Sequence, residues 1–264
     1  MILGVDLEEK SWSSYWDYYI KVHAIQIKNG KNIYLWQPFN KYYNYNTRGP
    51  GKIAEEILDM FPYAKEVAPY EKIVFSLKNV KIKEAKHSVK IHQHKEVGKD
   101  DIELLMKEVL ELNKNEVYEH EIIQILPFAF RLDSVGEVND PLGKKGATLE
   151  VSANIIYARK EKLDFMRKII KKLGTKVKSY NFVYSEYAKM ITELKIDEVD
   201  IYTENINYER LELEYKKIDS VSDWPRHYKL LLGLCLYGRG YNALYEVDSN
   251  GDVLLKGFQG EKNV

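Results

Sequence analysis

Cysteine is nearly absent from this 264-residue sequence, in which Cys235 stands alone. A single cysteine cannot form a disulfide within the chain, so a reducing, cytoplasmic setting is expected. Cys235 lies in the apolar run 230–236, where core packing is the usual role of a lone thiol.

Long hydrophobic runs and an excess of one charge are also missing. Lys plus Arg and Asp plus Glu are balanced at 40 each, which excludes the basic excess typical of nucleic-acid-binding proteins. No segment approaches the ~20 apolar residues that a transmembrane helix needs, and Asp6 comes too early for a signal peptide. Any recruitment to the inner face of the membrane is therefore expected to be indirect, through partners.

Aromatic residues are plentiful by contrast, with 21 tyrosines in the sequence. One cluster near the N-terminus contains Trp12, Tyr15, Trp16, Tyr18 and Tyr19. Aromatic side chains are enriched at protein interfaces, and they also pack at the base of hairpins. The cluster is thus either a partner-binding patch or the base of the first hairpin.

Hydrophobic periodicity predicts a mixed α/β chain. Strands are expected over residues 2–7, 18–27, 32–39, 72–77, 80–91, 121–132, 148–158, 177–183, 199–202 and 210–215. Helices are expected over residues 53–61, 100–112, 161–173, 185–194 and 226–236. Gly174 is a helix C-cap signal, and Asn250-Gly251 predicts the turn of a terminal hairpin. This order predicts a small α+β unit, residues 81–176, inserted into a larger α/β domain made of residues 1–80 and 177–264.

The inserted unit carries a specific motif. A strand containing Pro127 leads into Asp140-Pro141-Leu142-Gly143-Lys144-Lys145-Gly146-Ala147-Thr148-Leu149-Glu150. Gly143 and Gly146 can both adopt positive φ in a tight connection, and Pro141 stiffens it. This D-P-x-G-x-x-G-x-x-L-E turn, with the strand and helix that follow it, resembles the bacterial cell-division protein FtsA.

The resemblance implies an actin-like (ribonuclease-H-like) fold. Residues 1–80 and 177–264 would form subdomain 1A and a reduced 2A, and residues 81–176 the inserted 1C-type (SHS2) subdomain. In FtsA this subdomain contacts neighbouring subunits and division partners, so Asp140, Pro141, Gly143 and Gly146 are expected to form an interaction turn. The chain is divergent and shortened: it has no room for subdomain 2B, which in FtsA binds FtsZ and closes the nucleotide cleft.

The resemblance also implies a nucleotide site. Asp6, Glu186 and Asp200 take the positions where the family places Mg²⁺ or water. The two phosphate loops should be glycine-rich, yet residues 7–12 and 201–207 contain no glycine, and they add carboxylates. Bulky side chains block the backbone N–H groups from phosphates, and like charges repel them. The three acids are therefore expected to be vestigial, with ATP and Mg²⁺ weakly bound or absent and with no catalytic residues.

Other motifs are incomplete. Gly49-Pro50-Gly51-Lys52 fails the spacing of a phosphate loop, because Ile53 follows the lysine. His92 and His94 are spaced like zinc ligands, with His87 nearby, but no further ligand completes a site. No metal site is expected.

The sequence thus favours a non-catalytic, FtsA-like cytoplasmic scaffold that acts through protein–protein contacts, with itself or with division or assembly proteins. The glycine-poor loops argue against ATPase activity. Two alternatives stay open. One is a nucleotide-binding actin-like protein with unusual phosphate loops, and the other is an adaptor of type IV pilus assembly like PilM.

Overall fold

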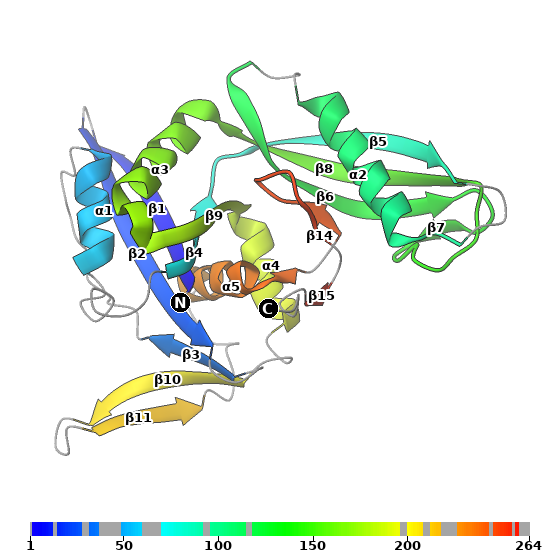
Figure 1. Cartoon of the computed structure of the whole chain (residues 1–264). Helices are drawn as coiled ribbons and strands as arrows, with labels where there is room; N and C mark the ends of the chain where they lie inside the picture. Colours follow the sequence, from blue (N-terminus) through cyan, green and yellow to red (C-terminus); the bar gives the residue numbers. More distant parts are fainter. Residues whose placement is uncertain are drawn as a thin grey trace. The chain divides into compact units, whose positions relative to one another are not determined.

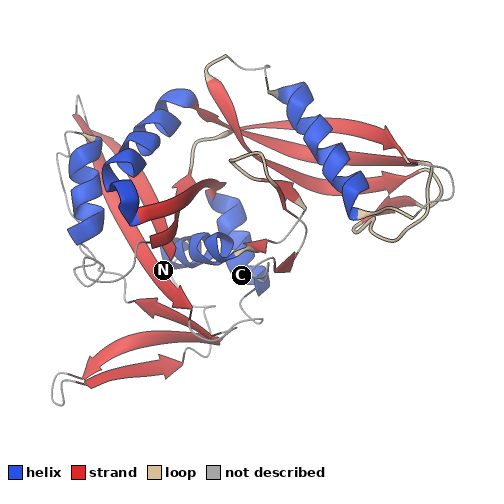
Figure 2. Ribbon diagram, viewed as in Figure 1, coloured by secondary structure: helices blue, strands red, loops and turns tan. Residues whose placement is uncertain are grey.

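The computed structural model describes residues 2–12, 15–27, 32–36, 49–59, 70–91, 96–114, 118–195, 200–207, 212–217, 226–242, 245–254 and 257–258. The chain divides into two compact units, each with its own main sheet (Figure 1; Figure 2). The first unit comprises residues 1–78 and 162–243, and the second comprises residues 79–161 and 244–264.

A seven-stranded sheet forms the base of the first unit. Its strands are β1 (Ile2–Trp12), β2 (Tyr15–Ile27), β3 (Asn32–Trp36), β4 (Tyr70–Leu77), β9 (Val177–Tyr184), β10 (Asp200–Asn207) and β11 (Glu212–Lys217). They lie in the order β11-β10-β3-β2-β1-β4-β9. β1, β4 and β9 run parallel, so their carboxyl ends meet at one edge, which is where open α/β sheets bind ligands.

The helices of this unit pack closely on the sheet and on each other. They are α1 (Pro50–Asp59), α3 (Lys160–Leu173, with its first two residues in the second unit), the 3-10 turn η2 (Gly174–Lys176), α4 (Ser185–Lys195) and α5 (Arg226–Arg239), which precedes β12 (Tyr241–Asn242). A Cβ added to Gly4 would lie 2.8 Å from the carbonyl oxygen of Leu231, so β1 touches the backbone of α5. A Cβ on Gly233 would lie 1.8 Å from the carbonyl oxygen of Ala188, so α5 and α4 also meet backbone to backbone.

The second unit has a smaller sheet. Its elements are β5 (Lys81–Lys90), α2 (Lys99–Asn113), β6 (His120–Leu132), β7 (Gly136–Val138), β8 (Thr148–Arg159), β13 (Glu246–Val247), β14 (Val253–Leu254) and β15 (Gly257–Phe258). Five strands lie in the order β14-β13-β6-β8-β5, and β7 pairs with the end of β6. β5, β8 and β6 are antiparallel neighbours.

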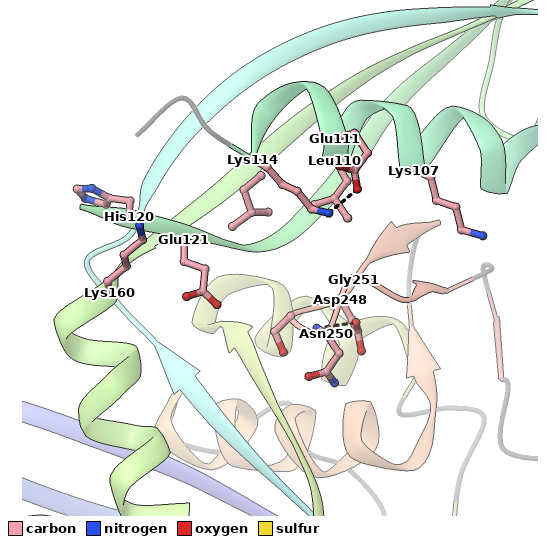
Figure 3. Close-up of a pocket in the computed structure, with 12 residues that line it drawn as sticks. Lys107, Leu110, Glu111, Lys114, His120, Glu121, Lys160, Asp248, Asn250 and Gly251 are labelled. Carbon is pink, nitrogen blue, oxygen red and sulfur yellow. Dashed lines mark hydrogen bonds and ion pairs between the residues drawn. The ribbon is translucent and has the colours of Figure 1, made fainter. Parts of the chain in front are cut away.

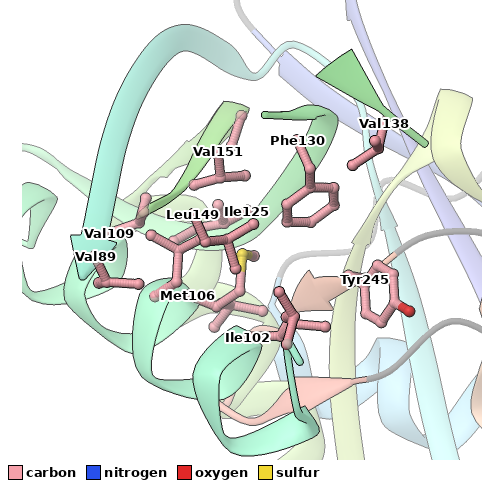
Figure 4. Packing of buried hydrophobic residues seen from close by; sticks show 14 of the residues in the cluster. Val89, Ile102, Met106, Val109, Ile125, Phe130, Val138, Leu149, Val151 and Tyr245 are labelled. Atoms are coloured by element: carbon pink, nitrogen blue, oxygen red, sulfur yellow. The ribbon is translucent and has the colours of Figure 1, made fainter. Parts of the chain in front are cut away.

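A hydrophobic core fills the space between α2 and this sheet (Figure 4). Ile102, Leu105, Met106 and Val109 recur at helical spacing and form the buried stripe of α2. The helix begins where the sequence predicts, because the backbone N–H of Gly98 donates to the Asp101 carboxylate at 2.7 Å.

Most predicted elements are present, with longer strands than expected. Gly174 has φ +59 at the end of α3, and Gly251 has φ +83 in the turn between β13 and β14, as their cap and hairpin signals predict. Residues 136–138, to which the sequence patterns assign no helix or strand, form β7. The predicted unit 81–176 overlaps the second unit, but most of α3 belongs to the first unit and residues 244–254 belong to the second. The assignment to actin-like subdomains stays a prediction.

Candidate functional site

Asp6 lies on β1 at the edge where the parallel strands end, and only 1% of it is exposed. The register that pairs Val5 with Phe75 brings Ser76 of β4 beside it. Ser76 Oγ donates to Asp6 Oδ1, and Lys78 Nζ lies 2.8 Å from Asp6 Oδ2. The buried negative charge is therefore balanced by an ammonium group from the same unit.

Glu186 lies in the first turn of α4, directly after β9. It is exposed, and its Oε1 is 2.6 Å from Lys189 Nζ. Burial, with a smaller effect of the Glu186 charge, raises the pKa of Tyr184 above its ordinary value of 10.0. An acid in this position stabilises the N-terminus of the helix, which accounts for Glu186 without a ligand.

Asp200 lies elsewhere in the sheet. It begins β10, opposite Asn32 at the start of β3. Two strands, β3 and β2, separate β10 from β1, which amounts to about 14 Å between strand axes. The start of β3 pairs with the end of β2, and the end of β2 pairs with the start of β1, whereas Asp6 lies further along β1. The structure does not bring Asp6 and Asp200 together.

The segments predicted as phosphate loops are strands. Residues 7–12 continue β1 and pair with β2 as far as Trp12 opposite Tyr15. Residues 201–207 belong to β10, and residues 202–207 pair with β11. Their N–H groups are thus parts of strands rather than of a loop that surrounds a phosphate. Both oxygens of Asp6 already have partners, Ser76 and Lys78, in the same unit. The vestigial role of Asp6, Glu186 and Asp200 stays a prediction.

The predicted interaction turn is a hydrogen-bonded connection in the second unit. Asp140 accepts two hydrogen bonds on Oδ1, from the N–H of Leu142 at 3.0 Å and from the hydroxyl of Tyr245 at 2.7 Å. Burial, followed by this hydrogen bond and the Asp140 charge, raises the pKa of Tyr245. Pro141 is buried and Gly143 has φ +75, so both contribute to the shape of the turn.

Backbone contacts fix the rest of the connection. The N–H of Gly143 donates to the carbonyl of Val97, and the N–H of Val97 donates to the carbonyl of Lys144, at 2.9 and 2.8 Å. A Cβ on Gly146 would lie 2.8 Å from Leu132 Cδ2, so a side chain there would push against the Leu132 side chain at the end of β6.

Asp133 closes the base of the same connection. Its Oδ1 accepts the N–H groups of Ala147 and Thr148 at 2.9 and 3.1 Å. These bonds, the one from Thr148 first, lower the pKa of Asp133 below 3.8. The fixed turn leaves Val135 and Leu142 exposed, at 58% and 42%.

A cavity of about 460 Å³ also lies in the second unit, among α2, the start of β6 and the β13–β14 turn (Figure 3). Its charged lining residues are Lys107, Glu111, Lys114, His120, Glu121, Lys160 and Asp248. Lys114 pairs with Glu111, and Lys160 Nζ donates to the carbonyl of Tyr118 at 2.8 Å. The two signs of charge offset each other, and the lining does not favour a particular ligand.

Some of the other residues singled out in the sequence can be placed in the structure. Cys235 is buried, and burial raises the pKa of its thiol to about 12, as expected for a packing residue. His92 and His94 lie outside the described residues, as do the side chains of the aromatic cluster at 12–19. In the described part of the chain, no group of His, Cys, Asp and Glu could hold a metal ion. No helix among the described ranges is long and apolar enough to cross a membrane.

Sequence reasoning missed Ser76 and Lys78 beside Asp6, and Tyr245 beside Asp140. Ser76 and Lys78 are 70 and 72 residues from Asp6 in the sequence, and Tyr245 is 105 residues from Asp140. The contact with Ser76 depends on the register of β1 against β4, which local patterns do not determine. A lysine directly after a buried parallel strand was the one available signal.

Comparison with known proteins identifies the second unit. Residues 78–157 match the SHS2 domain inserted in FtsA. The cell division proteins FtsA of two Helicobacter pylori strains are 39% identical over 80 residues, which is 30% of this chain and 16% of each relative. The resemblance to FtsA is therefore confirmed at the level of this domain, and the chain is a mixed α/β protein that contains it.

A solved structure of the PilM-PilN type IV pilus biogenesis complex is also similar. Its TM-score is 0.44 at 14% identity, and the match covers 78% of this chain and 55% of that chain.

Proposed function

We propose that this protein is a non-catalytic, FtsA-like scaffold that acts through contacts of its SHS2-type unit with protein partners in cell division or a related assembly. The observation that carries the proposal is the buried Asp6–Lys78 pair. It uses a lysine as counter-ion at the edge where an actin-like ATPase would need Mg²⁺ and phosphate. The actin-like arrangement of the first unit and the loss of subdomain 2B are parts of the same proposal.

The interaction turn gives the proposed scaffold a contact surface. Hydrogen bonds at Asp133 and Asp140 hold the turn, and Leu142 and Val135 are exposed on it. A fixed surface loses little conformational entropy on binding, which favours its use as a docking site.

Site-specific photo-crosslinking in cells of the source organism tests this proposal. A photoreactive amino acid replaces Leu142 or Val135 in the second unit. The matched control replaces Leu194 of α4, which is similarly exposed at 55% in the first unit. Crosslinked partners are identified by mass spectrometry.

We expect crosslinks from Leu142 and Val135 to a second copy or to a division protein, and few from Leu194. Partners that belong to pilus assembly would replace the division role with the adaptor role. Equal crosslinking from all three positions, or none from the turn, would overturn the proposed role of the second unit.

A further inference from the structure

The edge of the sheet in the second unit is open along β5. β5 ends the order β14-β13-β6-β8-β5, and it has no second neighbour in the part of the chain that the structure describes (Figure 1). Its pairing with β8 runs unbroken from Lys81 opposite Tyr157 to Lys90 opposite Thr148, without a bulge. Strand edges in natural proteins are commonly interrupted by prolines or bulges. β5 has neither, so its outer N–H and C=O groups form a regular template for another strand.

Successive side chains of β5 point to opposite faces of the sheet, so its two faces have different neighbours. His87 Nε2 lies 2.7 Å from Glu108 Oε2 of α2, and Val89 is part of the core under that helix. Odd-numbered residues of β5 therefore face α2, and even-numbered residues face away. Lys86 and Lys90 are both exposed on the face away from α2, together with one acid, Glu84.

α2 lines the open edge with apolar side chains. Leu104, Glu108 and Leu112 lie at i, i+4 and i+8 and share one flank of the helix. The contact between Glu108 and His87 places this flank next to β5. Leu104 and Leu112 are exposed at 50% and 62%, although they lie on a helix whose other face is fully packed.

We propose that the groove between β5 and α2 binds an extended segment of a partner protein by strand addition. The segment pairs its backbone with β5, turns apolar side chains toward Leu104 and Leu112, and turns carboxylates toward Lys86 and Lys90. Specificity thus comes from alternating apolar and acidic residues, while backbone hydrogen bonds supply affinity. The inference deepens the proposed scaffold role, since it names a surface and a class of partner for the same unit.

Lys86 and Lys90 favour this occupant over a second copy of the chain that pairs about Ser88. Antiparallel pairing of two β5 strands about Ser88 would place Lys86 of each copy opposite Lys90 of the other. Like charges directly opposite each other destabilise a strand pair, and opposite charges stabilise it. In this register the two lysines reject self-pairing and accept an acidic strand. Pairing about Ala85 would instead set Lys86 opposite Glu84 of the other copy, and the test below distinguishes that self-association from binding of a partner segment.

Fluorescence anisotropy with synthetic peptides tests the groove on the full-length protein. The probe is a fluorescein-labelled peptide of alternating glutamate and valine, and a lysine–valine peptide of equal length is its control. We expect the acidic probe alone to bind, with affinity that falls as salt rises. The double variant K86E/K90E should weaken binding about tenfold or more, and L104D/L112D should weaken it as well.

A matched variant and two modified probes separate strand addition from charge attraction. K171E/K172E reverses two exposed lysines of α3 and should leave binding unchanged. N-methylation of alternate probe residues removes the hydrogen bonds of one strand edge, so one of the two methylation patterns should abolish binding and the other should not.

Equal binding of both methylated probes, or equal effects of K86E/K90E and K171E/K172E, would overturn the inference. Self-association of the wild type that K86E/K90E abolishes would overturn it in favour of a second copy. None of these results depends on nucleotide, so failure of the groove is distinguishable from failure of the scaffold proposal, which nucleotide titration addresses.

Discussion

The two units use their charged side chains in opposite ways. In the first unit, the carboxylate of Asp6 is buried and neutralised by Lys78. In the second unit, Asp133 and Asp140 are exposed and hold backbone N–H groups of a surface connection. The first arrangement gives a buried carboxylate a cation from the same unit, and the second shapes an exposed connection. The contrast agrees with the proposal that the second unit makes the contacts with partners.

The two units also differ in how closely their helices pack. α5 approaches its neighbours through glycines, with Gly233 against the backbone of α4 and Gly4 of β1 against the backbone of α5. α2 packs through large side chains such as Leu105 and Met106, and it leaves Leu104 and Leu112 exposed. α5 is buried from Leu230 to Tyr237, whereas α2 is buried on one face and exposed on the other.

Substitution of Gly233 by alanine should give the largest effect. The added Cβ would meet the Ala188 carbonyl at 1.8 Å, so α4 and α5 must separate. We expect a loss of more than about 3 kcal/mol in the free energy of unfolding, measured by urea denaturation. Gly51→Ala in α1, where no atom lies within 4 Å of the new Cβ, is the control and should be neutral or slightly stabilising. Equal stabilities of the two variants would contradict close packing of α5.

Substitutions in the Asp6–Lys78 pair should give the second-largest loss of stability. Lys78→Met leaves a buried carboxylate without its cation, and we expect a loss of about 2 kcal/mol. Asp6→Asn should cost less, about 1 kcal/mol, because the Lys78 side chain is 36% exposed and water can solvate its ammonium. Thermal unfolding of both variants and of the double variant measures the coupling. A larger loss for Asp6→Asn than for Lys78→Met would show that the lysine does not serve as counter-ion.

Tyr245→Phe removes the hydrogen bond to Asp140 and should cost about 1 kcal/mol at neutral pH. The pKa of Tyr245 is raised in the folded state, first by burial and then by Asp140. Its contribution is therefore complete below the ordinary value of 10.0 and is lost as the pH rises above it. The wild type should lose its advantage over Tyr245→Phe as the pH rises from about 10 to about 12. A constant difference over this range would show that Tyr245 does not titrate with unfolding.

Asp133→Asn should give the smallest effect, because asparagine still offers an oxygen to the N–H groups of Ala147 and Thr148. The pKa of Asp133 is lowered in the folded state, so its contribution is present above 3.8 and is lost as the pH falls through the folded value. Amide exchange of Ala147 and Thr148 should be faster in the variant at neutral pH, and the difference should disappear in acid. Glu137→Gln on β7 is a control of equal charge change, and an effect on exchange as large as that of Asp133→Asn would contradict the assignment.

Much of the fold could be predicted from local patterns. The apolar stripe of α2, the cap at Gly174 and the turn at Gly251 each depend on residues within a few positions of one another. The D-P-x-G turn was predictable for the same reason, and it led to the domain that the comparison confirms. Long-range register was not predictable. The polar residues Glu8, Glu9 and Lys10 suggested a loop, yet pairing with β2 makes them strand.

For the candidate sites, too, local patterns identified single residues, and long-range register decided their partners. Asp6 was identified, but its partners Ser76 and Lys78 depend on how β1 and β4 align. Asp200 was grouped with Asp6 by family resemblance, and the strand order places β3 and β2 between β10 and β1. Leu104 and Leu112 gain significance only when the contact of Glu108 with His87 shows which strand their flank lies beside.

Calorimetric titration of the full-length protein with Mg²⁺·ATP tests the central claim most directly. A counter-ion already at Asp6 and strands in place of both predicted phosphate loops predict no binding heat up to about millimolar nucleotide, and no shift in melting temperature. Micromolar binding would contradict the non-catalytic scaffold and return the nucleotide-binding alternative to first place.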